Sequence, residues 1–483
     1  MIFDIRPIVL VLGVLIAVLG AAMFLPALVD YASGHEDWKI FFASASFTLV
    51  FGVLLVLATR GVNKALTTRQ AFVMTTMVWV ALATFGSLPL YWSGVTQSFT
   101  DAFFESMSGL TTTGATVIVG LDGLPPGILL WRGILQWLGG LGIIVMAVSV
   151  LPSLQIGGMQ LFKAEAFETA EKILPRATQI SGFITLIFLN VTALCMLAYL
   201  LVGMSVLDAA VHAMTTVATG GFSNYDASLG HFNSVSVDMI ATTFMIIGSL
   251  PFLLYVQALQ GQGKALVTDS QVRVFLTILC LFILCAWLIE QSVGAREGGD
   301  ALRFAMVNVT SILTGTGYAT TAYDGWGPVA VAFFFFIMFI GGCAGSTSCG
   351  IKIFRFQVLF QTLWQHLARI IFPHGIFLQR FNGRPIGDDV VSAVLGFFFL
   401  YLLTFAVSAM ALSICGVDPL TALSGAGSAI SNVGPGLGAI IGPAGNYQPL
   451  DDLPKWILAI TMLIGRLELF TVLVLLSPRF WRL

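Results

Sequence analysis

Charged residues are scarce in this chain. Only 10% of its 483 residues are Asp, Glu, Lys or Arg, whereas 57% are hydrophobic, and the formal net charge is −2. A nucleic-acid-binding protein needs a basic face, so this composition argues against nucleic acid as a partner. A mean hydropathy of +0.94 over this length exceeds what a soluble core requires and is typical of a polytopic membrane protein in a lipid bilayer.

Motifs for soluble or catalytic chemistry are also lacking. The six cysteines form no C-x-x-C pair and lie mostly in apolar runs, which favours buried thiols over disulfides or a metal site. No G-x-G-x-x-G follows an expected strand, and no nucleophile, carboxylate pair or metal-ligand set gathers in the apolar segments. We therefore expect neither an enzyme nor a covalently bound cofactor, and no nucleotide-binding domain within the chain.

Ten apolar segments are expected to form membrane helices: 8–29, 40–58, 71–92, 128–151, 180–206, 238–256, 272–289, 329–342, 390–415 and 456–476. No small-residue cleavage site follows the first segment, so it is interpreted as a retained helix and not as a signal peptide.

A short Thr/Gly motif recurs four times between these segments, at 106–117, 212–223, 308–319 and 427–438. Aligning the copies places one glycine from each at the same position: Gly114, Gly220, Gly317 and Gly434. Glycine tolerates backbone angles that other residues avoid, and irregular backbone persists at membrane depth only in a watery cavity or inside protein. Glycine for close helix packing is the alternative, but four copies favour one pore, in which carbonyl oxygens replace the hydration shell of a cation.

An aspartate precedes each aligned glycine by 12 to 17 residues: Asp101, Asp208, Asp300 and Asp418. Aspartate is favourable at a helix start, so each is predicted to begin a half-helix. Roughly eleven residues at ~1.5 Å each cover ~16 Å, which is about half a bilayer. These helices must re-enter the membrane, and their negative carboxyl ends would favour a cation.

The distribution of basic residues predicts the orientation. Segments 60–70, 155–177, 258–273 and 352–389, together with both termini, contain most of the 22 Lys and Arg residues and are expected to be cytoplasmic. The four turns would then open outward. Asp122, Asp226 and Asp324 follow the aligned glycines and are expected to make the outer mouth acidic.

Two features lie outside the repeat. Residues 326–360 would form ~52 Å of continuous helix, too long for a ~30 Å hydrocarbon core, and segment 341–350 is rich in glycine and serine, which predicts a bend or loop. Arg466 lies about ten residues, or ~15 Å, from either end of the last apolar segment, too deep to reach the surface. It is interpreted as a functional residue, with a structural ion pair or carbonyl cap as the alternative.

Several of these segments resemble the Trk/Ktr/HKT superfamily of potassium transporters, most closely its bacterial TrkH branch. The residues that carry the resemblance are TTTGATV, VATGGFSNYD, LTGTGYATTAYD, SNVGPGLG, GGCAGSTSCGIK and GRLELFTVL. The resemblance implies an all-α integral membrane fold, with four M1–P–M2 (helix, re-entrant pore helix, helix) repeats in a pseudo-fourfold arrangement around one pore. The expected units are an N-terminal helix pair (1–66), the repeats (67–154, 178–260, 268–360 and 388–483) and a cytoplasmic segment (361–387).

The resemblance also assigns roles to residues. The filter that binds potassium would comprise Thr112, Thr113, Gly114, Ala218, Thr219, Gly220, Gly315, Thr316, Gly317, Asn432, Val433 and Gly434. The gate would comprise Gly341, Gly342, Cys343, Ala344, Gly345, Ser346, Thr347, Ser348, Cys349, Gly350 and Arg466. Two residues depart from the family pattern: Gly315 stands where threonine is usual, and Cys349 stands where glycine is expected.

By the same resemblance, the chain is expected to carry potassium, and rubidium, into a bacterium through a gated pore in the cytoplasmic membrane, with both termini cytoplasmic. A homodimer and a cytoplasmic TrkA-type ring that binds NAD or ATP are the expected assembly. Coupling to H⁺ or Na⁺ is one alternative. Another is a secondary transporter with a midplane site, although such transporters use paired repeats and this motif recurs four times in one orientation.

Overall fold

The computed structural model of the chain describes residues 4–61, 66–149, 177–294, 298–375 and 377–482. The predicted cytoplasmic segment 155–177 therefore lies outside the described residues except for its last position. Seven helices in the described ranges are long and apolar enough to cross a membrane, or up to nine if each sharply bent pair counts as one span. The protein is a multi-pass membrane protein.

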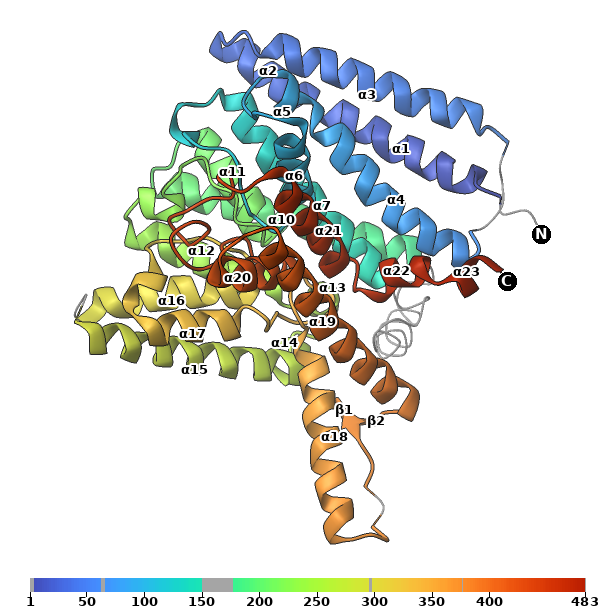
Figure 1. The fold of residues 1–483 in the computed structure, drawn as a ribbon, viewed down its shortest axis with the longest axis vertical. Coiled ribbons are helices and arrows are strands. Elements are labelled where there is room, and N and C mark those ends of the chain that lie inside the picture. Colours follow the sequence, from blue (N-terminus) through green and yellow to red (C-terminus); the bar gives the residue numbers. More distant parts are fainter. Residues whose placement is uncertain (1–3, 62–65, 150–176, 295–297, 376, 483) are drawn as a thin grey trace.

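The N-terminal unit is a pair of packed helical rods (Figure 1). In the first, α1 (Arg6–Ala22) continues past Met23 into α2 (Phe24–Ser33), and the second is α3 (Trp38–Ala58). Glycines bring the two rods together: a Cβ on Gly20 would lie 2.6 Å from the Leu49 backbone nitrogen, and one on Gly52 would lie 2.5 Å from that of Ala17. Such close backbone approach is how membrane helices without a polar interface pack.

The remaining helices form four units of similar order. The first contains α4 (Thr68–Gly86), α5 (Leu88–Trp92), α6 (Phe99–Leu110), η1 (Leu121–Gly123) and α7 (Pro126–Ser149). The second contains α10 (Ala177–Leu201), α11 (Val206–Val217), η2 (Ser228–His231), α12 (Val235–Ser249) and α13 (Phe252–Leu259), with α14 (Ala265–Thr268) after it. The third contains α15 (Ser270–Val293), α16 (Gly298–Thr314), η3 (Tyr323–Trp326), α17 (Pro328–Ile337) and α18 (Ile353–Ile371). A hairpin of β1 (Arg380–Phe381) and β2 (Arg384–Pro385) precedes the fourth, which contains α19 (Asp388–Ile414), α20 (Pro419–Ser431), α21 (Asp452–Arg466), α22 (Phe470–Leu473), η4 (Val474–Leu476) and α23 (Pro478–Arg482).

The four half-helices are α6, α11, α16 and α20, and three of them begin before the predicted aspartate. Helix α6 begins two residues before Asp101 because the Ser98 hydroxyl accepts the Asp101 N–H at 3.1 Å and so caps the helix. Ser205 caps α11 in the same way, and α16 begins at Gly298. Only Asp418 is itself a cap: one oxygen accepts the N–H groups of Leu420 and Thr421, each at 3.1 Å.

Two second helices bend where hydropathy predicted straight spans, and the predicted break in a third begins earlier than expected. The span 238–256 turns by 90° between α12 and α13, because Pro251 lacks an N–H and holds Leu250 in an extended conformation. The span 456–476 turns by 108° between α21 and α22, where Glu468 and Leu469 adopt positive φ. In the third unit α17 ends at Ile337, so the non-helical stretch begins before segment 341–350 and runs to Lys352.

The units close into a ring. The second helix of each unit packs against the half-helix of the next: α7 against α11, α12 against α16, and α21 against α6. Between units three and four, a Cβ on Gly427 of α20 would lie 3.0 Å from the Met338 sulfur and 3.1 Å from the Phe339 ring. The half-helices are therefore enclosed on all sides and meet at the centre of the protein.

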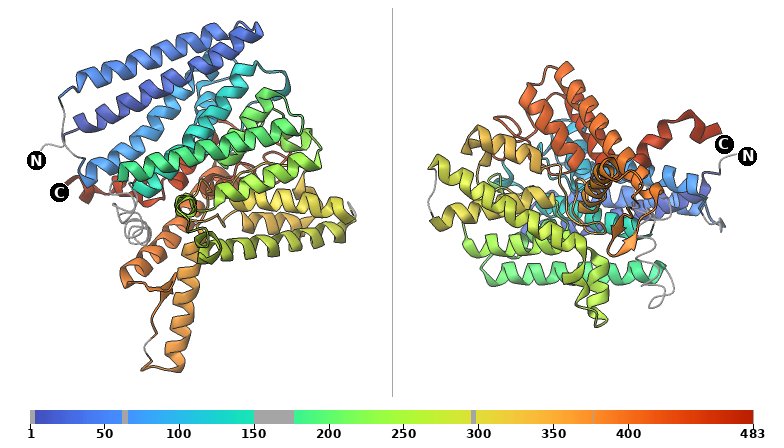
Figure 2. Two further views of the ribbon diagram at one scale, coloured as in Figure 1. Left: turned by 180° about the vertical axis from the view of Figure 1, so that it is seen from behind. Right: turned by 90° about the horizontal axis from the view of Figure 1, so that it is seen from below.

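The two ends of the chain lie side by side (Figures 1 and 2). The Gln70 side chain donates a 2.7 Å hydrogen bond to the Asp4 carbonyl, and the ring of Phe72 lies 6.1 Å from that of Phe480. Both termini thus lie on the same side of the protein as the start of α4.

Candidate ion pore

The four Thr/Gly turns share one backbone conformation. In each, the N–H at the centre of the turn donates to a carbonyl five residues earlier in the half-helix: Thr113 to Ser108, Gly220 to Thr215, Thr316 to Ser311, and Val433 to Ser428, at 2.8 to 3.0 Å. The residue before each centre has positive φ, namely Thr112, Thr219, Gly315 and Asn432. The residue after each centre is a glycine with φ between 77° and 103°, namely Gly114, Gly221, Gly317 and Gly434.

The second turn is therefore shifted by one residue from the sequence alignment. The sequence alignment paired Gly220 with Gly114 and Thr219 with Thr113. In the structure Gly221 takes the place of Gly114, and Gly220 takes the place of Thr113. Ala218 lies before the turn. Two adjacent glycines made the alignment ambiguous, and positive φ at the outer position selects Gly221. Gly221 thus stands where sequence reasoning placed Gly220, while Thr219 and Gly220 remain in this turn. We call the four turns the filter turns, and Gly114, Gly221, Gly317 and Gly434 the filter glycines, after the role predicted for them.

The turns form a closed ring of main chain. A Cβ built on each glycine would collide with a carbonyl oxygen of the neighbouring unit: Gly114 with Gly220 at 2.3 Å, Gly221 with Thr316 at 1.9 Å, Gly317 with Val433 at 2.0 Å, and Gly434 with Thr113 at 2.5 Å. These four contacts pass once around the protein and return to the first unit. Side chains are excluded at the four positions because backbone oxygens already occupy the space.

The ring forms the floor of a cavity of about 300 Å³, whose lining includes all four filter glycines. Of the three aspartates expected at its mouth, only Asp226 belongs to this lining. Its carboxylate accepts the N–H groups of Gly120 at 2.9 Å and Leu121 at 3.1 Å and so joins the outer loops of units one and two. Partial burial and a hydrogen bond to Asp208 raise the pKa of Tyr225, also in the lining, to about 12, so its phenol stays neutral.

The other units are joined by polar contacts as well. Arg303 pairs with Asp238 at 2.6 Å between units three and two, and Lys455 pairs with Asp101 at 2.6 Å between units four and one. The Asp324 carboxylate accepts the Gly438 N–H at 3.1 Å between units three and four. These contacts thus tie all four units in the same cyclic order as the filter turns.

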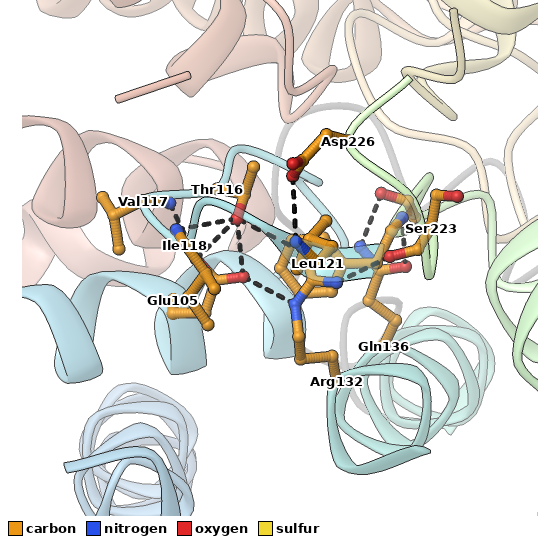
Figure 3. Close-up of polar contacts among 11 residues, drawn as sticks. Glu105, Thr116, Val117, Ile118, Leu121, Arg132, Gln136, Ser223 and Asp226 are labelled. Atoms are coloured by element: carbon orange, nitrogen blue, oxygen red, sulfur yellow. Dashed lines mark hydrogen bonds and ion pairs between the residues drawn. The ribbon is translucent and has the colours of Figure 1, made fainter. Parts of the chain in front are cut away.

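A buried ion pair lies behind the filter between units one and two (Figure 3). Glu105 of α6 and Arg132 of α7 are 2.8 Å apart, with side chains 0% and 2% exposed. Glu105 also accepts the Val117 N–H at 2.9 Å, and Arg132 donates to the Ser223 carbonyl at 2.7 Å. The pair thereby holds the chain that follows both filter turns.

Further side chains support individual filter residues. The Gln136 amide donates to the Gly220 carbonyl at 2.6 Å and accepts the Phe222 N–H at 3.0 Å. In unit four, the hydroxyls of Tyr447 and Ser428 donate to the Gly434 carbonyl at 2.7 and 2.8 Å. None of these residues, and neither member of the Glu105–Arg132 pair, was predicted. The presence of a Glu and an Arg in neighbouring apolar helices was a signal that could have indicated the pair.

Segment 341–350 lies against the inner ends of the half-helices. Its polar side chains Ser346, Thr347 and Ser348 are buried and donate to backbone carbonyls. Thr347 donates to Val217 at 3.0 Å and to Gly248 at 2.8 Å, and Ser348 donates to Thr314 at 2.7 Å. The segment therefore satisfies carbonyls that α11 and α16 leave unpaired at their carboxyl ends.

The remaining positions of this segment are also held by hydrogen bonds. The N–H groups of Gly341, Gly342, Cys343 and Ala344 donate to Ile351, Ser348, Ser249 and Gln271, respectively. Gly345 and Gly350 adopt positive φ, and the Gly345 carbonyl accepts the Phe252 N–H at 2.9 Å.

Arg466 meets this segment beneath the filter turns. Its guanidinium contacts the Cys349 sulfur at 2.8 Å, the Thr347 carbonyl at 3.3 Å and the Gly139 carbonyl at 3.4 Å. It therefore extends from α21 of unit four to units three and one. Arg355 of α18 and Glu468, which follows α21, form an ion pair that also joins units three and four.

Comparisons with known proteins agree with this architecture. The model of the TrkH family, described as "Cation transport protein", matches residues 38–483. The chain belongs to the TrkH family. Trk system potassium uptake protein TrkI of Halomonas elongata is 46% identical over 479 residues, covering 99% of this chain and 97% of that protein. Trk system potassium uptake protein TrkH of Vibrio parahaemolyticus is 39% identical and covers 99% of both chains.

The crystal structure of the potassium transporter TrkH from Vibrio parahaemolyticus superimposes with a TM-score of 0.92 at 36% identity, covering 99% of this chain and 100% of that one. This match confirms the predicted fold class, four M1–P–M2 repeats of the TrkH type. Membership of the TrkH family places the chain among membrane transporters and makes the closed glycine ring its candidate ion path.

Proposed function

We propose that this TrkH-family protein takes up potassium across the bacterial cytoplasmic membrane through a selective, gated, channel-like pore. The observation that carries the proposal is the ring in which each filter glycine abuts a carbonyl of the next unit. The carbonyls of Thr113, Gly220, Thr316 and Val433 would replace the hydration shell of K⁺. The related proteins named potassium uptake proteins support the choice of ion.

The gate in this proposal is segment 341–350 together with Arg466. The segment fills the space under the half-helices, and Arg466 places a fixed positive charge there. A positive charge repels a permeating cation, and the low dielectric of the protein interior strengthens the repulsion. Conduction then requires the segment to move, and this movement breaks its contacts with Arg466.

A flux assay tests both statements. Purified protein in liposomes should take up Rb⁺ and K⁺ down their gradients and discriminate against Na⁺, with no movement of H⁺ or Na⁺ in a fixed ratio to K⁺. Shortening 343–349, or Arg466→Ala, should raise flux in the absence of any partner. Equal Na⁺ and K⁺ flux would refute the selective pore, and fixed-ratio coupling would establish a symporter instead.

The assembly in this proposal is a homodimer regulated by a cytoplasmic TrkA-type ring that binds NAD or ATP. Helix α18 projects away from the helical body (Figures 1 and 2), and Phe360, Trp364, Ile370 and Ile371 on it are 67% to 76% exposed. An apolar surface of this size on a projecting helix is unfavourable in water and typical of an interface. Trp364→Glu should yield monomers by light scattering in detergent, whereas Gln361→Glu on the same helix should leave the dimer intact.

A further inference from the structure

The four filter turns differ two residues before the filter glycine. Thr112, Thr219 and Asn432 carry a side chain there, whereas Gly315 of the third repeat has none. Two of these side chains reach the second helix of their own unit: Asn432 donates to the Met462 carbonyl of α21 at 2.9 Å, and the Thr219 methyl would lie 3.3 Å from a Cβ on Gly248 of α12. The third repeat needs another group to make this connection.

Cys349 occupies the corresponding space. A Cβ on Gly315 would lie 3.1 Å from the Cys349 Cβ, 3.3 Å from its backbone nitrogen and 3.5 Å from its Cα. A larger side chain at 315 would therefore displace Cys349, and a smaller residue at 349 would leave the space empty. The two residues fit each other, although one belongs to the filter turn and the other to segment 341–350.

The Cys349 thiol, which belongs to repeat three, contacts two of the other repeats. Its sulfur lies 3.4 Å from the Thr112 hydroxyl of repeat one and 2.8 Å from the Arg466 guanidinium of repeat four, while Cys349 abuts Gly315 of repeat three. The sulfur is the nearest of the three acceptors of Arg466, whose Nε has no hydrogen-bond partner. Cys349 thus lies under the ring of filter turns, where its sulfur contacts the guanidinium of Arg466.

We propose that Cys349 is a positioning residue of the gate, whose thiol replaces the side chain absent at Gly315 and holds Arg466 across the inner end of the filter. This inference rests on the proposed function, because it assigns a part to one residue of the proposed gate. The other three side chains belong to the filter turns and stay with them. The thiol belongs to segment 341–350. A movement of this segment therefore removes both the group that replaces the missing side chain at Gly315 and the nearest hydrogen-bond acceptor of Arg466.

The test is a double-mutant cycle on partner-free Rb⁺ flux in liposomes. Cys349→Gly should raise flux about tenfold or more, the factor expected for losing a hydrogen bond to a charged group. Gly315→Asn should also raise flux, because the added side chain pushes Cys349 away, and Asn432 shows that asparagine tolerates this backbone conformation. The double variant Gly315→Asn/Cys349→Gly should return flux toward the low initial value.

Cys349→Ser distinguishes positioning from mere filling, because a hydroxyl still accepts a hydrogen bond from Arg466 and should keep flux low. Cys195→Ala, a buried cysteine of α10, is the matched control and should leave flux unchanged. The proposal would be overturned if the flux increases of the two single variants multiply in the double variant. It would also be overturned if Cys349→Ser raises Rb⁺ flux as much as Cys349→Gly does.

Thiol reactivity gives a readout that does not depend on transport. In a background with Cys280, Cys285 and Cys415 replaced by serine, Cys349 should react slowly with a methanethiosulfonate reagent, because it is only 5% exposed. Gly315→Asn should accelerate the reaction about tenfold or more. Unchanged reactivity would refute the contact between the two residues, whereas the expected reactivity without Rb⁺ flux in any variant would refute the proposed function instead.

Discussion

Breaking the Glu105–Arg132 pair should both destabilise the protein and loosen the filter. Glu105→Gln keeps the shape of the side chain but removes the charge that compensates a fully buried guanidinium. Removing one partner of such a pair costs about 3 to 5 kcal/mol. That is a large share of the roughly 5 to 15 kcal/mol by which folded proteins are stable. Thermal unfolding in detergent, followed by size-exclusion chromatography, should therefore show a clearly lowered Tm.

The effect on transport follows from what the pair holds. Glu105 accepts the Val117 N–H and Arg132 donates to the Ser223 carbonyl, so the pair connects the chain that follows the first and second filter turns. When it is broken, the chain that follows Gly114 and Gly221 loses these two hydrogen bonds and is no longer held in one position. We expect the ratio of Rb⁺ to Na⁺ flux in liposomes to fall, while total flux per folded protein persists.

Two controls make the reasoning refutable. Glu36→Gln removes the same charge from an exposed pair with Lys39, and surface pairs contribute little, so Tm should not change measurably. The double variant Glu105→Met/Arg132→Met leaves no unpaired charge and should regain most of the stability, but not the selectivity, because both backbone hydrogen bonds are lost. A Glu105→Gln protein with unchanged Tm and selectivity would refute the account.

Two further predictions concern single filter residues. Gly221→Ala should abolish Rb⁺ flux, because its Cβ would lie 1.9 Å from the Thr316 oxygen. The control Gly123→Ala, with no atom within 4 Å of the new Cβ, should transport normally. Normal flux in Gly221→Ala would contradict the revised alignment of the second turn. Tyr447→Phe removes one of two hydroxyls that donate to the Gly434 carbonyl and should cost about 1 kcal/mol in discrimination between Rb⁺ and Na⁺, measured as the flux ratio, while Tyr91→Phe at the exposed end of α5 should have no effect.

The sequence by itself determined the features that depend on local composition. Apolar length predicts the helices because a bilayer requires a minimum span, and four Thr/Gly motifs predict four turns because only glycine tolerates their backbone and crowding. The excessive length of the run 326–360 indicated the break between α17 and α18. Each of these inferences needs only neighbouring residues and the thickness of the membrane.

The tertiary structure decided whatever depends on residues distant in the chain. Gly220 and Gly221 are equally good glycines in the sequence, and only the Thr316 carbonyl of the next repeat selects Gly221 for the ring. Glu105 reaches Arg132 across 27 positions, and Arg466 reaches Thr347 across 119. Hydropathy and backbone preference carry no information on such pairings, because these contacts exist only after helices that are distant in the chain have packed together.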